Sequence, residues 1–322
     1  MSNPLAVVIL TYNEELNLPA CLESLRGLPG ELYIVDSGST DGTVEIAASA
    51  GARILVHPFE SHARQWRWAL DNLPCTPRWV LGLDADQRLS AELRREIVDL
   101  LETGADAGID GYYLNRRQVF RRRWIKHGGY YPKYLLKLFR PDAVYVDERD
   151  LIDHHFYVRG RVAKLKHDLI EANLKEDEIG FWIEKHNRYA VLHAREELAR
   201  RLSQDELPIQ PALMGSPDQR TLWLKLRWYG LPLYVRPFMY FVYRYVLRLG
   251  FLDGKQGLIF HFLQGFWYRL LVDVNLDDML DQSAPRVDRP LDTATSARHR
   301  SPAAVTAVRP AVTSGGGSRD TA

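Results

Sequence analysis

The stretch Trp79–Ser90, WVLGLDADQRLS, reads as a strand that ends in two aspartates. Its first half is a continuous apolar run, which is typical of a strand buried on both faces of a parallel sheet. Asp84 and Asp86 follow one residue apart, and Ser90 is a suitable N-cap for a helix after them. Two carboxylates in this place serve either a turn or a ligand.

The residues around this stretch alternate between strand and helix patterns. The strand-type runs are LAVVIL, ELYIVD and ARILVH, and segments with helical spacing of their apolar residues lie between them. This alternation predicts an α/β fold with a mostly parallel, doubly wound sheet. Beyond about Gly111 the pattern becomes irregular, and we expect an aromatic-rich, helical C-terminal region that begins with the later stretch FWIEKHNRYAVLHAREELARRL.

Three of the predicted strands end in polar clusters, at residues 11–14, 36–41 and 84–86. Ligands of open α/β sheets bind at the carboxyl ends of the strands. The chain has neither G-x-G-x-x-G after its first strand nor G-x-x-x-x-G-K-[ST], which argues against a classical dinucleotide fold and a P-loop NTPase. Carboxylates repel a phosphate ligand unless a cation lies between them, and Mg²⁺ or Mn²⁺ is bound in this way. The residues therefore predict a metal-bound diphosphate.

Composition and charge narrow the class of protein. The chain is 46% hydrophobic and 26% charged, as in ordinary soluble proteins, and its net charge of +1 argues against nucleic acid as a partner. Cys21 and Cys75 form no C-x-x-C pair, which fits a reducing compartment. The start MSNPLAVVIL lacks a basic segment, and no apolar stretch reaches the 18 or so residues that span a bilayer. We therefore expect a cytoplasmic protein.

The motifs VVILTYNEELNL, IVDSGSTDGT and LGLDADQRLS, in this order, resemble those of family 2 inverting glycosyltransferases, which have a GT-A fold. The resemblance covers residues 5–150. It implies that Thr11, Tyr12 and Glu14 line a nucleoside pocket, with the Tyr12 ring stacked on the base. It also implies that Asp36 accepts a hydrogen bond from the base, which we expect to be uracil.

The same resemblance assigns separate tasks to the two aspartates of the opening stretch. Asp84, with Ala85 beside it, would contact the donor at its ribose. Asp86 would bind the Mg²⁺ or Mn²⁺ ion that bridges the diphosphate of the sugar nucleotide.

Two further assignments follow from the resemblance. Relatives often carry Asn where this chain has Arg67, and Arg64 or Gln65 would make the donor contact in its place. The catalytic base would come from Glu148 or Asp147 in the segment VDERDL, where relatives carry an acidic residue that faces the acceptor. We expect Glu148 to be the base.

Later pieces of the chain resemble enzymes of lipopolysaccharide core assembly. These pieces are LKHDLIEANLK, WIEKHNRYA and YRYVLRLGFLDGKQGLIFHFLQGFWYRLLVD. They imply an envelope polysaccharide or a lipid-linked glycan as acceptor. The segment 112–141 has no acidic residue, so its basic side chains form either a solvated face or a surface for an acceptor that carries phosphate groups.

Residues 219–252 contain ten aromatic and six basic residues and no acidic one. Tryptophan and tyrosine mixed with arginine are typical of an element at a membrane interface. The alternatives are an aromatic subdomain packed on the catalytic core, or an oligomer interface. We expect a peripheral protein at the inner face of the cytoplasmic membrane.

These patterns suggest four regions. Residues 1–150 would bind the nucleotide sugar, 151–215 would form a helical extension on the acceptor side, 216–282 would form the aromatic-basic region, and 283–322 would be a disordered tail. The main hypothesis is a metal-dependent inverting glycosyltransferase that uses a UDP-sugar. The alternatives are a non-catalytic membrane-surface protein with a degenerate nucleotide-binding domain and, more weakly, a nucleotidyltransferase.

Overall fold

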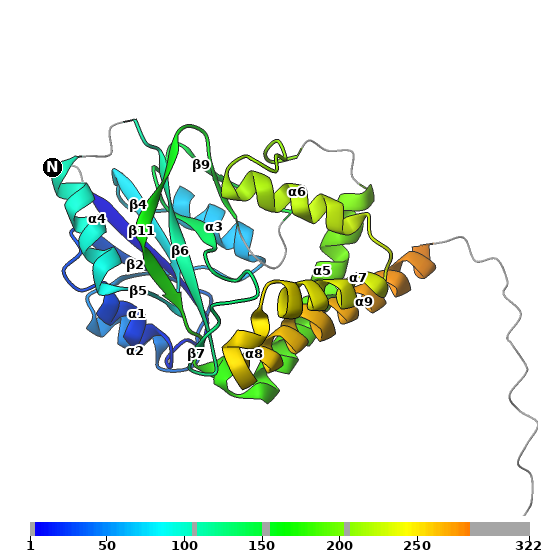
Figure 1. Ribbon diagram of the computed structural model, residues 1–322. Coiled ribbons are helices and arrows are strands. Elements are labelled where there is room, and N and C mark those ends of the chain that lie inside the picture. The colour runs from blue at the N-terminus through cyan, green and yellow to red at the C-terminus, as the bar shows by residue number, and fades with distance from the viewer. Residues whose placement is uncertain (1–3, 105–107, 150–154, 203–206, 284–322) are drawn as a thin grey trace, which may run out of the picture. The chain divides into compact units, whose positions relative to one another are not determined.

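The computed structural model describes residues 4–104, 108–149, 155–202 and 207–283, which form an α/β part followed by a helical part (Figure 1). Contacts join the chain up to Ser283 into one compact unit. In the described ranges no helix is long and apolar enough to cross a bilayer. The region boundary expected at 150 and 151, and all but the first residue of the expected tail, lie outside the described residues.

Four parallel strands form the first half of the main sheet. Their bounds are β1 Leu5–Thr11, β2 Glu31–Asp36, β3 Arg53–Val56 and β4 Trp79–Asp84. They lie in the order β3-β2-β1-β4. In register, Thr11 lies opposite Asp36, and Leu10 lies opposite Asp84. The ends of β1, β2 and β4 therefore meet at one edge, and the predicted α/β fold class is confirmed.

Helices cover both faces of this half-sheet, as the doubly wound pattern predicts. α1 Leu18–Ser24, α2 Thr43–Ser49 and α4 Ala91–Thr103 pack on one face, and α3 His62–Asp71 packs on the other. The predicted N-cap is confirmed, because Ser90 Oγ accepts a hydrogen bond from the Leu93 N–H at 3.1 Å. A cap of this kind stabilises a helix by about 1 kcal/mol.

The second half of the sheet is mixed rather than parallel. Its strands are β5 Gln87–Leu89, β6 Gly111–Phe120, β7 Arg123–Trp124, β8 Tyr134–Phe139 and β11 Val162–Glu171, while β9 Val144–Val146 and β10 Phe156–Val158 pair separately. The chain turns back after β6, so β8 runs antiparallel between β4 and β6. β11 pairs with β5, which brings Glu171 opposite Gln87, one residue after Asp86.

The described elements beyond β11 are all helical, which confirms the expected helical C-terminal region. The elements are η1 Lys175–Asp177, α5 Ile179–Leu202, α6 Pro217–Tyr229, α7 Val235–Val242, η2 Tyr243–Leu247, η3 Gly250–Asp253, α8 Gly254–Phe260, η4 His261–Trp267 and α9 Tyr268–Ser283. α5 and α9 lie side by side around a core that includes Ala190, Ala194, Val272 and Leu276 (Figure 1).

A fully buried ion-pair cluster joins three of these helices. Arg236 of α7 donates hydrogen bonds to Glu197 of α5 at 2.8 and 3.0 Å, and to Asp273 of α9 at 2.6 and 2.8 Å. None of the three side chains has exposed surface. Buried charges are tolerated in proteins when each has a partner, and here each has one.

His261, at the start of η4, is buried, and neither ring nitrogen has a hydrogen-bond partner among the described residues. The ring lies so close to Gly128 that a Cβ atom there would come within 2.0 Å of it. Burial lowers the pKa of His261 to about 4; Arg244 and His127 also disfavour the charged ring, and Asp253 favours it.

We therefore expect His261 by itself to lower the free energy of unfolding as the pH falls below about 6.5, whereas Asp86, whose pKa is raised to about 8, acts in the opposite direction over this range. The unfolded chain binds a proton at the ordinary histidine pKa of about 6.5, whereas the folded chain does so only near the lowered pKa of His261. Near pH 5 this difference costs about 2 kcal/mol of unfolding free energy, and the loss is absent well above about pH 6.5. Urea unfolding of the wild type and of His261→Gln, near neutral pH and near pH 5, isolates this contribution. Between the two pH values the wild type should lose about 2 kcal/mol relative to His261→Gln, and an equal pH dependence in both proteins would contradict this assignment.

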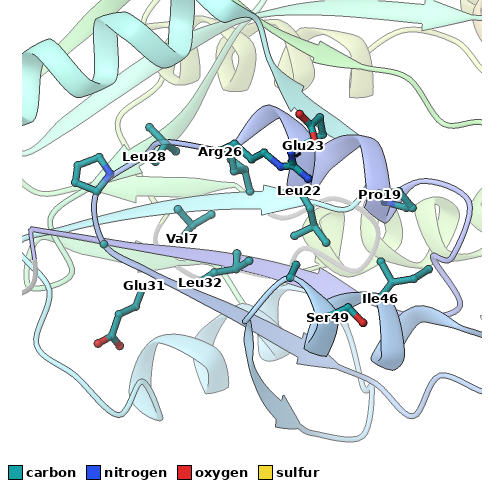
Figure 2. Close-up of a pocket in the computed structure, with 14 residues that line it drawn as sticks. Val7, Pro19, Leu22, Glu23, Arg26, Leu28, Glu31, Leu32, Ile46 and Ser49 are labelled. Carbon is teal, nitrogen blue, oxygen red and sulfur yellow. Dashed lines mark ion pairs between the residues drawn. The ribbon is translucent and has the colours of Figure 1, made fainter.

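An open hollow of about 540 Å³ lies between α1 and α2, over β1 and β2 (Figure 2). Apolar side chains such as Val7, Leu22 and Leu32 line it. Its charged lining includes Glu23 and Arg26, which pair with each other at 2.9 Å. The hollow contains none of the residues that the strand-end motifs single out.

Candidate active site

The side chain of Asp36 ties the end of β1 to the loop after β2. Thr11 Oγ1 and Ser39 Oγ donate to Asp36 Oδ1 at 2.9 and 2.5 Å, and the N–H groups of Gly38 and Ser39 donate to Oδ2 at 2.9 and 2.8 Å. Asp36 is 2% exposed. Four donors use the acceptor positions of a carboxylate. The nucleobase of a donor therefore reaches Asp36 only if the hydroxyl of Thr11 or Ser39 turns away.

The motif after β1 leaves one aromatic side chain in the open. Tyr12 is 57% exposed. The next residue, Asn13, has a left-handed backbone with a φ of 54°. Its N–H donates to Ser39 Oγ at 2.8 Å, and its Oδ1 accepts from the Thr40 N–H at 2.8 Å. An open ring on a fixed backbone suits the stacking role that the resemblance implies for Tyr12.

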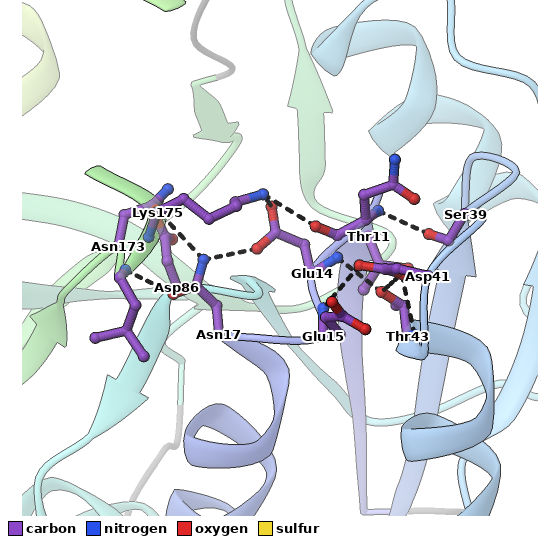
Figure 3. A network of polar contacts seen from close by, with 12 residues as sticks. Thr11, Glu14, Glu15, Asn17, Ser39, Asp41, Thr43, Asp86, Asn173 and Lys175 are labelled. Carbon is purple, nitrogen blue, oxygen red and sulfur yellow. Dashed lines mark hydrogen bonds and ion pairs between the residues drawn. The ribbon is translucent and has the colours of Figure 1, made fainter. Parts of the chain in front are cut away.

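Glu14 is bound to the segment that follows β11 (Figure 3). Lys175 Nζ donates to Glu14 Oε1 at 2.6 Å and to the Asn13 carbonyl at 3.1 Å. Asn17 Nδ2 donates to Glu14 Oε2 at 2.7 Å, and Asn17 Oδ1 accepts from the Leu174 N–H at 2.8 Å. The first motif and a segment more than 150 residues later in the chain thus form one polar network.

Asp86 joins this network through Asn173 (Figure 3). Asn173 Nδ2 donates to Asp86 Oδ2 at 3.2 Å. Asn173 Oδ1 accepts from Asn17 Nδ2 and from the Lys175 N–H, both at 3.1 Å. Both ends of the amide are engaged, so Asn173 fixes the direction of the Asp86 carboxylate.

Asp84 has a different partner, a lysine from β8. Lys137 Nζ donates to Asp84 Oδ2 at 3.0 Å, and the side chains of Lys137 and Asp84 are 5% and 30% exposed. The positive charge of Lys137 therefore balances the charge of Asp84, and the Asp84 carboxylate is still partly exposed to a ligand.

Negative charge accumulates around Asp86. Burial, then the neighbouring carboxylates of Glu171 and Asp84, raise the pKa of Asp86 to about 8, although Lys185 acts in the opposite direction. Arg116 Nη1 donates to Glu171 at 3.0 Å, so Glu171 itself is paired. A divalent cation beside Asp86 relieves this repulsion, because it favours the ionised carboxylate.

The described residues contain no group of three His, Cys, Asp or Glu side chains that could hold a metal ion by themselves. Mg²⁺ is usually held by one or two carboxylates together with substrate phosphates rather than by a cage of protein ligands. The single carboxylate of Asp86, in a crowded acidic setting, fits an ion that is completed by a diphosphate.

The two candidate bases differ in their contacts. Asp147 is buried and accepts from Arg149 Nε at 2.8 Å, with Arg200 at 3.5 Å. Burial raises the pKa of Asp147, but the hydrogen bonds from Arg149 and the charge of Arg200 outweigh it and leave that pKa below its ordinary value. The Glu148 side chain is 52% exposed, and its nearest charged partner is Arg64 at 3.9 Å. Glu148 is therefore the better candidate of the two.

Arg64, Gln65 and Arg67 of α3 contact different parts of the protein. Gln65 is buried, and its Nε2 donates to Ser37 Oγ at 3.1 Å, so it supports the loop after β2. Arg64 is 57% exposed at the start of the helix. Arg67 donates to Asp71, one turn further along α3, at 2.8 Å. Both arginines are thus exposed and paired, Arg64 with Glu60 and Arg67 with Asp71, and Arg64 also lies 3.9 Å from Glu148.

Sequence reasoning missed Lys137, Lys175 and Asn173 as site residues. Lys137 and Arg116 are members of the acid-free segment 112–141, but the structure uses both in ion pairs with site carboxylates. The signal was present, since basic residues on strands of a sheet with an acidic edge are candidates for such pairs. Asn173 lies in the piece LKHDLIEANLK, whose resemblance connected it with the acceptor class and not with the donor site.

Comparison with known proteins gives a family for the first half of the chain. Residues 6–164 match the family model described as Glycosyl transferase family 2. The lipopolysaccharide core biosynthesis glycosyltransferase LpsC of Rhizobium meliloti (strain 1021) is 38% identical over 135 residues, which are 40% of this chain and 46% of LpsC. Glycosyltransferase AglJ of Haloferax volcanii is 34% identical over 120 residues, 36% of this chain and 39% of AglJ. The chain spans less than half the length of these curated relatives.

Two solved structures are also similar. TarS of S. aureus has a TM-score of 0.41 and 15% identity, covering 85% of this chain and 54% of TarS. Glucosyl-3-phosphoglycerate synthase of Mycobacterium tuberculosis, in complex with Mn²⁺ and UDP-glucose, has a TM-score of 0.31 and 25% identity, covering 36% of this chain and 44% of that protein. The family match, rather than these loose superpositions, identifies the domain.

Proposed function

Residues 6–164 form a glycosyltransferase family 2 domain, and on this premise we propose that the protein is a metal-dependent, inverting glycosyltransferase. It moves a sugar from a UDP-sugar to a hydroxyl group of an envelope polysaccharide or a lipid-linked glycan. One observation carries the proposal: Tyr12, Glu14, Asp84 and Asp86 follow strands whose ends meet at one edge of the sheet. The other contacts of the site support it.

Asp84 and Asp86 have separate tasks in the donor site. Asp84, compensated by Lys137, offers a fixed carboxylate to a ribose hydroxyl. Asp86, oriented by Asn173, holds Mg²⁺ or Mn²⁺. The bound ion supplies charge stabilisation for the departing diphosphate, worth several kcal/mol in such sites. Tyr12 stacks on the uracil ring of the donor.

Glu148 accepts the proton of the acceptor hydroxyl. The acceptor oxygen then forms its bond to the anomeric carbon, while the bond from that carbon to the diphosphate oxygen breaks and its electron pair leaves with the UDP. Attack and departure occur on opposite faces of the sugar, so the configuration inverts. The exposure of Glu148 and its position beside Arg64 support this role.

The acceptor class implies a place in the cell. Lipopolysaccharide is anchored in a membrane, and the similar protein LpsC is named for lipopolysaccharide core biosynthesis. In the proposal the enzyme is peripheral and works at the inner face of the cytoplasmic membrane, with region 216–282 on the membrane side. The aromatic and basic composition of residues 219–252 supports this placement.

Donor hydrolysis tests the proposed activity without knowledge of the acceptor. Incubation with a panel of UDP-sugars and Mn²⁺ should release UDP slowly from at least one of them, and a chelator should stop the release. If no UDP-, GDP- or ADP-sugar is hydrolysed, the result favours a second candidate function. In that case the protein binds a nucleotide at the membrane surface without catalysing a reaction. The engagement of Arg67 by Asp71, along its own helix, favours that candidate.

Asn173→Ala is expected to weaken the joint binding of Mn²⁺ and UDP by about 10- to 100-fold, the range for residues that orient a metal ligand. The physical reason is the lost hydrogen bond to Asp86 Oδ2, which frees that carboxylate to rotate. Titration calorimetry with Mn²⁺ in the presence of UDP measures the change. Asn72→Ala is a matched control, because Asn72 Nδ2 donates to the Trp68 carbonyl of the preceding helix at 2.9 Å, away from Asp86. An affinity equal to that of the wild type in folded Asn173→Ala would refute the positioning role.

A further inference from the structure

The continuous helix formed by α7 and η2 carries its large apolar side chains on the outside. They recur at the i, i+3, i+4 spacing of one helix face, and each is between 44% and 68% exposed. They are Val235, Phe238, Met239, Tyr243, Val246 and Leu247. On the opposite side, Arg236 is fully buried and Arg244 is largely covered. An ordinary surface helix of a soluble protein has the reverse arrangement.

The inward-facing cations have fixed partners, so this orientation is specified by the fold. Arg236 lies in the buried cluster that links α5, α7 and α9. Arg244 Nη1 donates to the Gly128 carbonyl at 2.7 Å, and its Nη2 donates to the Tyr240 hydroxyl at 2.6 Å. Its guanidinium also lies over the Tyr130 ring, 4.7 Å from the centroid. Rotating the helix to bury its apolar side would break all of these contacts.

The apolar surface continues beyond η2 into the elements that pack against it. Five more large apolar side chains there are between 45% and 52% exposed, and they are Leu249, Phe251, Leu252, Leu258 and Phe262. η3 packs on η2, and α8 packs on η3. We call these eleven residues between 235 and 262 the apolar face. Single exposed apolar residues are normal on proteins, but a gathering of this size marks an interaction surface.

The charge along the segment that carries the apolar face is almost entirely of one sign, although the neighbouring α9 carries acidic residues, among them Asp277, which accepts from the Tyr234 hydroxyl. Residues 219–272 include eight basic residues and a single acidic one, Asp253. Asp253 is 4% exposed and accepts from the His127 N–H at 2.8 Å, so its charge is turned inward. Four of the basic residues are exposed: Arg220, Arg227, Arg248 and Lys255. The described surface of this segment is thus apolar and cationic, without an exposed carboxylate.

We infer that the apolar face and these four basic residues dock the protein on an anionic phospholipid leaflet. Apolar side chains enter the boundary between headgroups and acyl chains, and basic side chains lie at the headgroups, as in interfacial helices. A second copy of the chain is a poorer occupant, because two such faces bring like charges together. The inference rests on the proposed function and extends it, because it names the protein surface that contacts the membrane and the charge of the lipids that this surface binds.

Residues 235–262, which carry the apolar face and are called the docking segment below, also fix the direction from which an acceptor comes. The Gly128 N–H donates to the Arg248 carbonyl at 2.9 Å, and the His127 ring bonds to Asp253 at 2.7 Å. The docking segment thus holds the loop after β7, and β7 pairs with the carboxyl end of β6. A lipid-anchored acceptor would reach the sheet edge along this loop.

Vesicle flotation tests the inference on the full chain. We expect recovery with vesicles that contain phosphatidylglycerol, little recovery with phosphatidylcholine alone, and release as salt is added. Each exposed basic residue contributes about fivefold to partitioning, so Arg248→Glu with Lys255→Glu lowers it by at least about 25-fold. Leu247→Glu with Phe251→Glu should lower it by at least about tenfold, whereas Met214→Glu should not. Met214 is 95% exposed and lies outside the apolar face.

Two further measurements separate this inference from the proposed function. Circular dichroism checks that each variant folds, and UDP titration checks the donor site. Loss of vesicle binding in the folded double variants, with UDP binding intact, is the expected result. Retained vesicle binding in those variants, or equal binding of the wild type to neutral vesicles, would overturn the docking surface and leave the glycosyltransferase proposal standing. A second copy of the chain is tested by light scattering. If the wild type is a dimer that does not bind vesicles, and Leu247→Glu with Phe251→Glu makes it a monomer, the apolar face belongs to a second copy and the docking inference is overturned.

Discussion

Glu148→Gln is expected to lower kcat by about 10²- to 10⁴-fold, the usual contribution of a general base. Glutamine keeps the size and polarity of the side chain but cannot accept the proton of the acceptor hydroxyl. The affinity for UDP should stay near that of the wild type, because Glu148 contacts Arg64 rather than any strand-end residue. Steady-state transfer assays and UDP titration separate the two quantities.

Glu60→Gln is a closely matched control for this experiment. Glu60 also pairs with Arg64, and its side chain is 57% exposed against 52% for Glu148. Glu60 is in direct hydrogen-bond contact with Arg64, whereas Glu148 lies 3.9 Å away, so removal of Glu60 disturbs Arg64 at least as much as removal of Glu148, but only Glu148 is placed as the base. Equal losses of kcat in both variants would assign the effect to Arg64 and refute the role of Glu148.

Arg236→Met is expected to lower the free energy of unfolding by about 3–5 kcal/mol, the cost of removing one partner from a buried ion pair. Glu197 and Asp273 have no exposed surface, and the substitution leaves both carboxylates buried without the guanidinium between them. Urea unfolding, followed by circular dichroism, measures this loss.

Two further variants show whether charge or packing causes it. Arg188→Met removes an exposed arginine that lies 3.7 Å from Glu184, and exposed pairs of this kind contribute about 0.3–0.5 kcal/mol. Replacing Arg236, Glu197 and Asp273 by apolar residues of similar size should restore most of the stability, because no unpaired charge stays fully buried: Arg201, which also pairs with Glu197, is 31% exposed. If the triple variant is as unstable as Arg236→Met, lost packing rather than an unpaired charge is the cause.

Local patterns were enough to predict the first half of the fold. The runs LAVVIL, ELYIVD and WVLGL are apolar throughout, and only a strand covered on both faces uses such residues in that way. Ser90 was recognisable as a cap from its position before an amphipathic segment. Parallel pairing then brings the ends of β1, β2 and β4 together without any knowledge of side-chain contacts.

The second half depends on contacts between residues far apart in the chain. Nothing local in YLLKLF indicates that β8 runs antiparallel beside β4 and places Lys137 on Asp84. Likewise, Asn173 reaches Asp86 and Asn17 because β11 ends beside β5. Pairings of this kind are set by the whole sheet, so a reading of short motifs identifies the carboxylates but not the cations and amides that orient them.

The composition of residues 219–252 also could not predict which of their side chains are exposed to solvent. The sequence of residues 219–252 suggested aromatic and basic side chains on opposite sides of an element, without indicating which side faces outward. The buried cluster of Arg236 fixes that choice, because it holds a charged side chain inward and leaves Phe238 and Leu247 outside.

Titration calorimetry of UDP into the wild type and into Asp86→Asn, each with and without Mn²⁺, tests the central claim most directly. The account predicts that Mn²⁺ strengthens UDP binding by the wild type, and that this strengthening is lost in the folded variant. The same UDP affinity with and without Mn²⁺, or the absence of UDP binding by the folded wild type, would contradict a metal-dependent nucleotide-sugar site at the ends of β1, β2 and β4.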